Sequence, residues 1–208
     1  MTLARLVQIQ RGISSCRECP DVVGRPVHCA PILSRILLIG QAPGVHEESR
    51  GRPFAHTAGK TLFRWFEECA GVDEAYFRAH VYMAAVARCF PGRASSGGDR
   101  VPDGTEIANC RRHLKLETAL LRPQLILPVG KLAIAQVLGP TVYPANAKLA
   151  DVVGKKFTAT FLGETADVIC LPHPSGLSTW HQTAPGKALL KKALREIVRH
   201  PAWREEME

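Results

Sequence analysis

Short apolar runs alternate along this chain with longer segments whose apolar residues recur at helical spacing. Runs of four to six mostly apolar residues predict strands, and the amphipathic segments predict helices. The predicted strands are 35–40, 81–86, 125–130 and 168–171, and the predicted helices are 58–70, 103–121, 131–138 and 186–200. The alternation predicts an α/β fold, a three-layer α/β/α sandwich around a central, mostly parallel four-stranded sheet.

In a sheet of this kind, the loops at the carboxyl ends of the strands build the functional site. This rule selects residues 40–59, 89–103 and 172–183. The most loop-like part of the chain, 92–104, is rich in Gly and Ser and contains Arg93 and Arg100. We expect this segment to be a mobile, solvated surface loop.

Composition narrows the class of protein further. The 208 residues are 46% hydrophobic and contain no apolar run near the roughly 20 residues of a membrane span. The first residues lack the pattern of a signal peptide, so a cytoplasmic protein without membrane contact is expected. Length and pattern predict a single domain over 1–208, whose N-terminal part, 1–33, carries a C-x-x-C pair.

The net charge of the chain indicates what kind of partner it binds. Lys and Arg number 27 against 19 Asp and Glu, which gives a formal net charge of +8. A surplus of this size favours polyanionic partners, because it creates a positive field over the surface.

Two loops at the predicted sheet edge carry candidate chemistry. The first predicted strand runs into Gly40-Gln-Ala-Pro-Gly44, where glycines let backbone amides approach a ligand closely. The fourth runs into His173-Pro-Ser-Gly-Leu-Ser178, which places a histidine and hydroxyl groups beside the first loop. Polar groups that converge from two loops predict a ligand site.

These motifs, in this order, resemble the uracil-DNA glycosylase superfamily, and most closely its bacterial iron–sulfur branch, known as family four. That branch has a Gly-Glu-Ala-Pro-Gly loop, an acidic pair, Gly-x-Pro-Phe, Ala-Gly and a later His-Pro-Ser/Ala box. The resemblance covers residues 16 to about 178. The matching positions are Gly40–Gly44, Glu47-Glu48, Gly51-Arg-Pro-Phe54, Ala58-Gly59 and the box that begins at His173.

The resemblance implies a monofunctional DNA repair enzyme that flips a damaged base out of the stack and hydrolyses its N-glycosidic bond, leaving an abasic site. Phe54 would stack on the base, and Ala42 and Ala85 would line the base pocket. His173 would donate a hydrogen bond to the departing base, where negative charge develops.

The resemblance also implies contacts with the DNA strand. The leucine of the second box, Leu177, would enter the duplex as an apolar wedge. Arg50 and Arg52, with the hydroxyl groups of Ser175 and Ser178, would bind phosphates. DNA with damaged bases is thus the expected partner; no nucleotide cofactor is expected, and the protein is expected to be a monomer.

Two positions depart from the family pattern. Gln41 stands where family four has glutamate, and an amide can orient water but cannot take its proton. Glu47 is then the best remaining carboxylate to position the water, and Glu48 and His46 are the next candidates. Ala85 stands where the relatives have an asparagine that pairs with the uracil edge. Losing that amide predicts a broader range that includes deaminated purines such as hypoxanthine or xanthine.

Seven cysteines do not suggest a disulfide framework, because a reducing compartment would not keep the bonds. The pair Cys16-Arg-Glu-Cys19 needs two further ligands to hold a metal. The resemblance implies Cys89 and Cys110 and a structural [4Fe-4S] cluster. Zinc on the same thiolates is the alternative cofactor. Cys29 competes with Cys110 as fourth ligand, and Cys69 and Cys170 are expected to be buried thiols.

Two other functions stay open at this point. Gln41 and Ala85 are compatible with an iron–sulfur DNA-binding protein that senses lesions but has lost catalysis. A glycosylase-like protein that stays covalently attached to its product is a third possibility. The short 48–51 stretch disfavours it, because it has no room for that branch's extra basic loop.

Overall fold

The sheet of the protein has five strands within the residues that the computed structural model describes, 2–95, 97–176 and 178–208. The spatial order is β2-β1-β3-β5-β4. Strands β2, β1, β3 and β5 are parallel to one another, and β4 pairs with β5 in the antiparallel sense. The strands are β1 (Ile36–Gly40), β2 (Tyr82–Ala85), β3 (Leu125–Pro128), β4 (Lys156–Phe161) and β5 (Glu164–Ile169).

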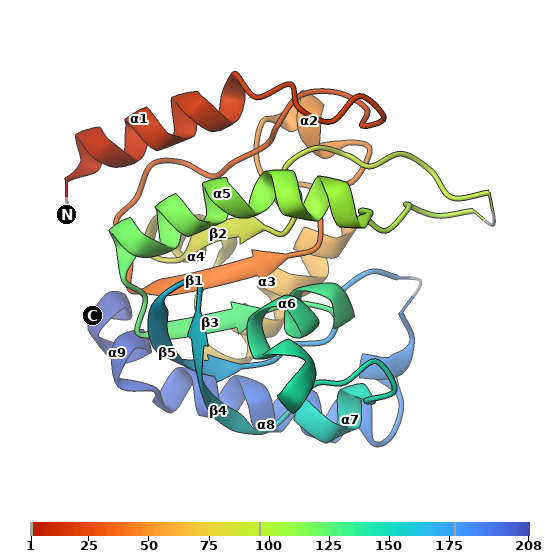
Figure 1. Ribbon diagram of the computed structural model, residues 1–208. Helices are drawn as coiled ribbons and strands as arrows, with labels where there is room; N and C mark the ends of the chain where they lie inside the picture. Colours follow the sequence, from red (N-terminus) through yellow and green to blue (C-terminus); the bar gives the residue numbers. More distant parts are fainter. Residues whose placement is uncertain (1, 96, 177) are drawn as a thin grey trace.

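Helices cover both faces of the sheet, which confirms the predicted three-layer α/β/α sandwich (Figure 1). One face carries α1 (Leu3–Ser14), α5 (Gly104–Leu121) and α6 (Lys131–Val142). The opposite face carries α3 (Thr57–Ala70), α4 (Glu74–His80), α8 (Gly186–Arg199) and α9 (Pro201–Met207). The short elements are α2 (Glu47–Arg50), α7 (Leu149–Val152) and the 3-10 turn η1 (Trp180–Gln182).

The predicted strand count of four was too low. The additional strand, β4, alternates exposed and half-buried residues such as Lys156 and Phe157 because it lies at the sheet edge. Its partner β5 begins at Glu164, before the apolar run predicted at 168–171. An apolar run identifies a strand buried on both faces. Strand β4 lacks such a run because one of its faces meets solvent, whereas β2, at the other edge of the sheet, is buried throughout. Helices α1 and α9 were also not predicted.

The core lies on both sides of β1 and β3, whose side chains are buried along their whole length. On the α3 face, an aromatic cluster joins α3, α4 and α9: the ring of Phe66 lies 4.6 Å from that of Phe77 and 5.1 Å from that of Trp203. Apolar burial of this kind provides most of the folding free energy. No helix of the described chain is long and apolar enough to cross a membrane.

An ion pair is buried on the other face. Arg88 follows β2, and its guanidinium pairs with Glu117 of α5, with both side chains almost fully excluded from solvent. Tyr82 donates its hydroxyl hydrogen to Oε1 of Glu117 at 2.6 Å. Gln10 of α1 donates to the Tyr82 oxygen at 3.2 Å and to the carbonyl of Cys29 at 3.1 Å. This network links α1, β2 and α5.

We predict that Glu117→Gln lowers the free energy of unfolding by roughly 3–5 kcal/mol, because it leaves the buried Arg88 charge without a counterion. Urea unfolding measures the change. The matched substitution Glu205→Gln at the exposed side chain of α9 should change stability by no more than about 0.5 kcal/mol. A loss below about 1 kcal/mol for Glu117→Gln would contradict a strong buried pair.

Candidate active site

A cavity of about 530 Å³ opens at the carboxyl ends of β1 and β2. The loops that follow β1, β2 and β5 all contribute to its wall, as the topology of a parallel sheet requires. It brings together seven of the residues that the sequence predicted: Gln41, Ala42, Glu47, Phe54, Ala85, His173 and Ser175.

Phe54 is held in an unusual backbone conformation in this wall. Its φ is 53°, in the left-handed region that non-glycine residues rarely occupy. A Cβ at Gly40 would lie 2.9 Å from the ring of Phe54, and one at Gly59 would lie 1.7 Å from its carbonyl oxygen. Both glycines are therefore needed for the ring to lie against the end of β1. Strain of this kind is typical of functional sites.

Arginines fix the loop that carries Phe54. Arg78 of α4 donates to the carbonyl oxygens of Pro53 and Phe54, each at 2.9 Å. Arg50 donates to the carbonyl of Ala55 at 2.6 Å. Arg52 forms an exposed ion pair with Glu74 at 3.5 Å. The two arginines predicted to bind phosphates thus have partners within the protein, and neither lines the cavity.

His173 presents a hydrogen-bond donor to the cavity. The Ser175 N–H donates to Nδ1 at 3.2 Å, so Nδ1 is the unprotonated nitrogen and Nε2 carries the hydrogen. Burial lowers the pKa of His173, and the charge of Asp99 opposes this effect only in part. Gly130, at φ 86°, leaves room for the ring, since a Cβ there would lie 3.2 Å from Cδ2.

Glu47 is buried at the start of α2. Burial raises the pKa of its carboxyl from 4.5 to about 7, although backbone hydrogen bonds at Phe54, Ala55 and Gly44 favour the charged form. The carboxyl group therefore contacts the loop that carries the strained phenylalanine, and it holds a proton for much of the time at neutral pH.

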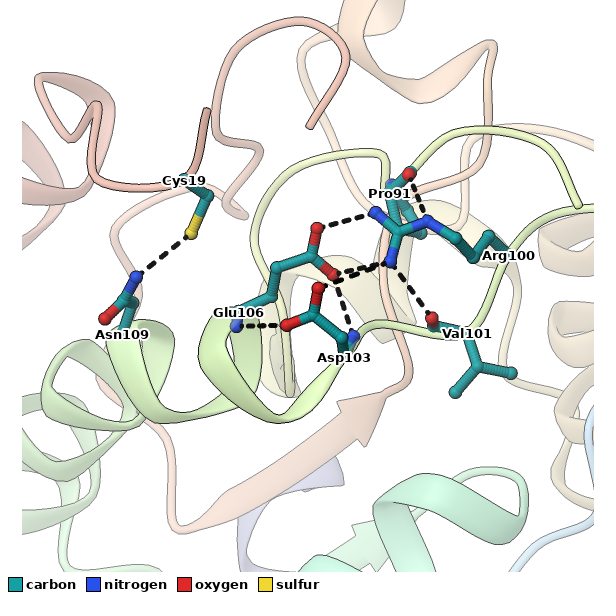
Figure 2. Close-up of polar contacts among 7 residues, drawn as sticks. All are labelled: Cys19, Pro91, Arg100, Val101, Asp103, Glu106 and Asn109. Atoms are coloured by element: carbon teal, nitrogen blue, oxygen red, sulfur yellow. Dashed lines mark hydrogen bonds and ion pairs between the residues drawn. The ribbon is translucent and has the colours of Figure 1, made fainter. Parts of the chain in front are cut away.

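The loop at 92–104 differs from its prediction. Arg100 donates to the carbonyl of Pro91 at 2.9 Å and to both carboxyl oxygens of Glu106, at 2.6 and 3.1 Å. Figure 2 shows this clamp against the first turn of α5, where Asp103 and Glu106 form a capping box. The C-terminal end of the 92–104 loop is therefore anchored to α5, and two residues of the loop, Asp99 and Arg100, line the cavity of about 530 Å³. The sequence analysis missed Asp99; the capping box ahead of α5 was the available signal that the loop's end is fixed.

The four predicted ligand cysteines line a second cavity of about 160 Å³ between the N-terminal segment, the end of β2 and α5. Cys29 does not line it and instead packs in the core. Side chains of α5 approach the sulfurs: Asn109 donates to Cys19 at 3.4 Å (Figure 2), and Arg112 donates to Cys16 at 3.7 Å. The cavity lining is completed by residues that include His113 and Arg88.

The donor set of this cavity consists of four cysteine sulfurs. Burial, together with the charges of Cys110, Cys16 and Cys19, raises the pKa of Cys89 to about 12. Four thiolates this close need a cation to stabilise them. Yet the described residues contain no group of three or more His, Cys, Asp or Glu placed to hold a single metal ion. Four cysteine sulfurs around one cavity are a donor set that both zinc and an iron–sulfur cluster use.

The remaining predicted residues lie outside both of these cavities or outside the residues that the structure describes. Cys170 is fully buried as predicted, but Cys69 is exposed on α3, which corrects its prediction as a core thiol. Ser178 donates its N–H to the Ser175 carbonyl and does not line the larger cavity. The predicted wedge, Leu177, lies outside the described residues.

Comparison with known proteins defines the class. The family model of the uracil DNA glycosylase superfamily matches residues 26–198. The chain therefore belongs to this superfamily, which confirms the resemblance and the enzyme class, a DNA glycosylase that hydrolyses N-glycosyl bonds.

Individual relatives agree with this membership. A type-4 uracil-DNA glycosylase of Sulfurisphaera tokodaii is 26% identical over 93% of this chain and 80% of its own length. One of Archaeoglobus fulgidus is 29% identical over 83% of this chain and 82% of its own. A type-5 uracil-DNA glycosylase of Thermus thermophilus is 29% identical over 61% of this chain and 68% of its own.

We predict that Glu47 makes stability depend on pH. Its folded-state pKa is raised, so its contribution to stability is complete below about pH 4.5 and is lost as the pH rises through about 7. The difference between the two pKa values corresponds to about 3 kcal/mol. The free energy of unfolding of Glu47→Gln, relative to that of wild type, should therefore rise by about 3 kcal/mol from pH 4 to pH 8. Chemical unfolding at the two pH values measures the change. A stability difference that does not change with pH would refute the raised pKa.

Proposed function

We propose that this protein hydrolyses the N-glycosidic bond of uracil in DNA and leaves an abasic site. The observation that carries the proposal is the presence of Phe54 and His173 in one cavity: an aromatic ring on a strained backbone and a neutral imidazole that carries its hydrogen on Nε2. In this proposal, Phe54 is the stacking surface for a flipped base, and His173 is the donor to the charge of the leaving group.

The chemistry follows from this arrangement. A nucleotide flipped into the cavity stacks its base on Phe54. As the C1′–N bond breaks, negative charge spreads to a carbonyl oxygen of the base, and Nε2–H of His173 donates to that oxygen. A neutral donor suits this role, because it stabilises the base anion without first giving up a proton. The lowered pKa of His173 keeps the imidazole neutral at physiological pH.

Water must reach C1′ from the wall that Gln41 and Glu47 form. Gln41 can orient a water molecule through its amide, and Glu47 can accept a hydrogen bond when it is ionised. With a pKa of about 7, Glu47 is only partly ionised at neutral pH, so it is a weak base on its own. The cation that forms at C1′ is electrophilic enough to react with weakly activated water.

The range of bases that the protein excises depends on the side chains that line the cavity. Ala85 and Ala42 line the cavity and carry no polar side-chain atoms, so the wall at these positions cannot select the uracil edge by hydrogen bonding. We therefore propose that hypoxanthine and xanthine are excised as well as uracil. On the DNA strand, Ser175, Ser178, Arg50 and Arg52 remain our candidates for phosphate contacts, with Leu177 as the wedge.

We further propose that the cysteine cavity holds a [4Fe-4S] cluster through Cys16, Cys19, Cys89 and Cys110. The four sulfurs surround one space, and Asn109 and Arg112 donate to two of them. Such a cluster would tie the N-terminal segment to α5 and the end of β2, a structural role separate from the base cavity. A monomer in the cytoplasm remains our expectation.

A lesion-binding protein without catalysis is the second candidate. Gln41 and Ala85 favour it, because each removes a group that the relatives' motifs carry at that position. Release of free uracil from a single-lesion oligonucleotide in excess over the protein separates the two functions. Multiple turnovers support the glycosylase; tight lesion binding without base release supports the sensor. A band that resists denaturing electrophoresis would indicate covalent attachment.

We predict that His173→Ala reduces the single-turnover rate of uracil release by roughly 10²–10³-fold, the usual cost of losing a donor to a developing anion. Quench-flow sampling of free uracil measures the rate. Affinity for an abasic-site analogue should change little, because the donor acts on the base. A rate within threefold of wild type would show that His173 is not the donor.

We predict that Cys110→Ser removes the visible absorbance and most of the iron and sulfide of anaerobically purified protein, whereas Cys29→Ser retains both. The reason is that Cys110 lines the cysteine cavity and Cys29 does not. Loss of iron from the Cys29 variant, with retention in the Cys110 variant, would reverse the ligand assignment. Stoichiometric zinc in wild type would exclude the cluster.

A further inference from the structure

We propose that Asp99 is a catalytic residue, the carboxylate that orients the attacking water and takes its proton. The inference rests on the proposed glycosylase function and adds to it a residue from a loop that neither family motif contains. Asp99 lies in the 92–104 loop and lines the same cavity as Gln41, Phe54 and His173.

The position of the carboxylate is defined from two sides. Its Oδ2 lies 3.4 Å from where a Cβ at Gly44 would stand, so it reaches the first loop at its second glycine. Its charge also acts on His173, the group assigned to the leaving base. Asp99 is exposed at this wall, where water has access, and it faces the same space as the imidazole.

The loop fixes its backbone on both sides of Asp99. Asp99 pairs with Arg93 in an isolated antiparallel bridge, and the next residue, Arg100, donates its backbone N–H to the carbonyl of Gly92 at 2.8 Å. The Arg100 guanidinium is clamped between Glu106 and the carbonyl of Pro91 (Figure 2). Glu106 is almost fully buried at the first turn of α5. The clamp therefore begins one residue after Asp99 and ends on a helix of the core.

Gln41 and Glu47, which line the same cavity, are less suited than Asp99 to take the proton of the attacking water. Gln41 has no basic atom that can accept the proton of water. Glu47 is buried, engages backbone groups of the Phe54 loop and has a pKa of about 7. Asp99 offers a carboxylate that is accessible to water, and its negative charge also stabilises the cationic sugar as the bond breaks.

The step balances as a hydrolysis. The C1′–N bond breaks, and its electron pair stays with the base, whose anion His173 stabilises. The water oxygen forms the new bond to C1′ while its proton passes to Asp99 and then to solvent. The base anion takes up one proton from solvent. The products are an abasic site and the free base, and no oxidant or metal takes part.

The test uses the full chain and a uracil-containing oligonucleotide under single-turnover conditions. Asp99→Asn should lower the rate of uracil release by at least roughly 100-fold, within the range for a lost general base. Asp99→Glu should restore part of the rate. Asp151→Asn, an exposed aspartate on α7 outside the cavity, is the matched control and should leave the rate unchanged.

A further readout separates chemistry from loop structure. Affinity for DNA with a tetrahydrofuran abasic analogue should be retained or increased in Asp99→Asn, since the variant removes a negative charge near the strand. A collapsed loop would weaken that affinity.

The outcomes are distinguishable. An Asp99→Asn rate within threefold of wild type overturns the proposal, as does a parallel loss of rate and of DNA affinity. A full rate in Asp99→Asn with a 100-fold loss in Glu47→Gln would assign the proton to Glu47 instead. If wild type releases no uracil, the proposed function itself fails, and the role of Asp99 fails with it.

Discussion

The buried pair of Arg88 and Glu117 lies between the base cavity and the cysteine cavity. Arg88 contributes to the walls of both the base cavity and the cysteine cavity, and its guanidinium is held by a glutamate in the middle of α5. Three residues before it, Ala85 lines the base cavity, and one residue after it, Cys89 lines the other. A charge this deep is tolerated only with its partner, so the pair fixes the end of β2 against α5. Both proposed sites depend on that position.

The base cavity rests on a second constraint, the left-handed backbone at Phe54. Gly40 and Gly59 leave the space that its ring and carbonyl require, and Arg78 holds the loop by two carbonyl oxygens. Folding energy from the core therefore maintains a strained loop in one conformation, and the base surface is formed before DNA binds. The contacts of Arg100 with Glu106 and with the carbonyl of Pro91 fix the 92–104 loop in the wall of the same cavity. In this account, neither part of the wall has to be assembled by the substrate.

Much of this arrangement could be predicted from the sequence, because parallel strands buried on both faces produce continuous apolar runs. The runs at 35–40 and 125–130 predicted the central strands. The loops after the runs at 35–40 and 168–171 contain Phe54 and His173. The edge strand β4 was missed because one of its faces meets solvent. The anchoring of the 92–104 loop was missed for another reason: it depends on a contact between Arg100 and a buried glutamate, which composition does not reveal. A Gly- and Ser-rich segment looks flexible whether or not its ends are clamped.

The proposed function requires that a flipped base lies between Phe54 and His173. The most direct measurement is a crystal structure with an oligonucleotide that contains 2′-fluoro-deoxyuridine, whose glycosidic bond resists cleavage. We predict a uracil stacked on the Phe54 ring, with Nε2 of His173 within hydrogen-bond distance of a carbonyl oxygen. A uracil bound elsewhere on the protein, or left paired in the duplex while the protein is bound at the lesion, would contradict the account.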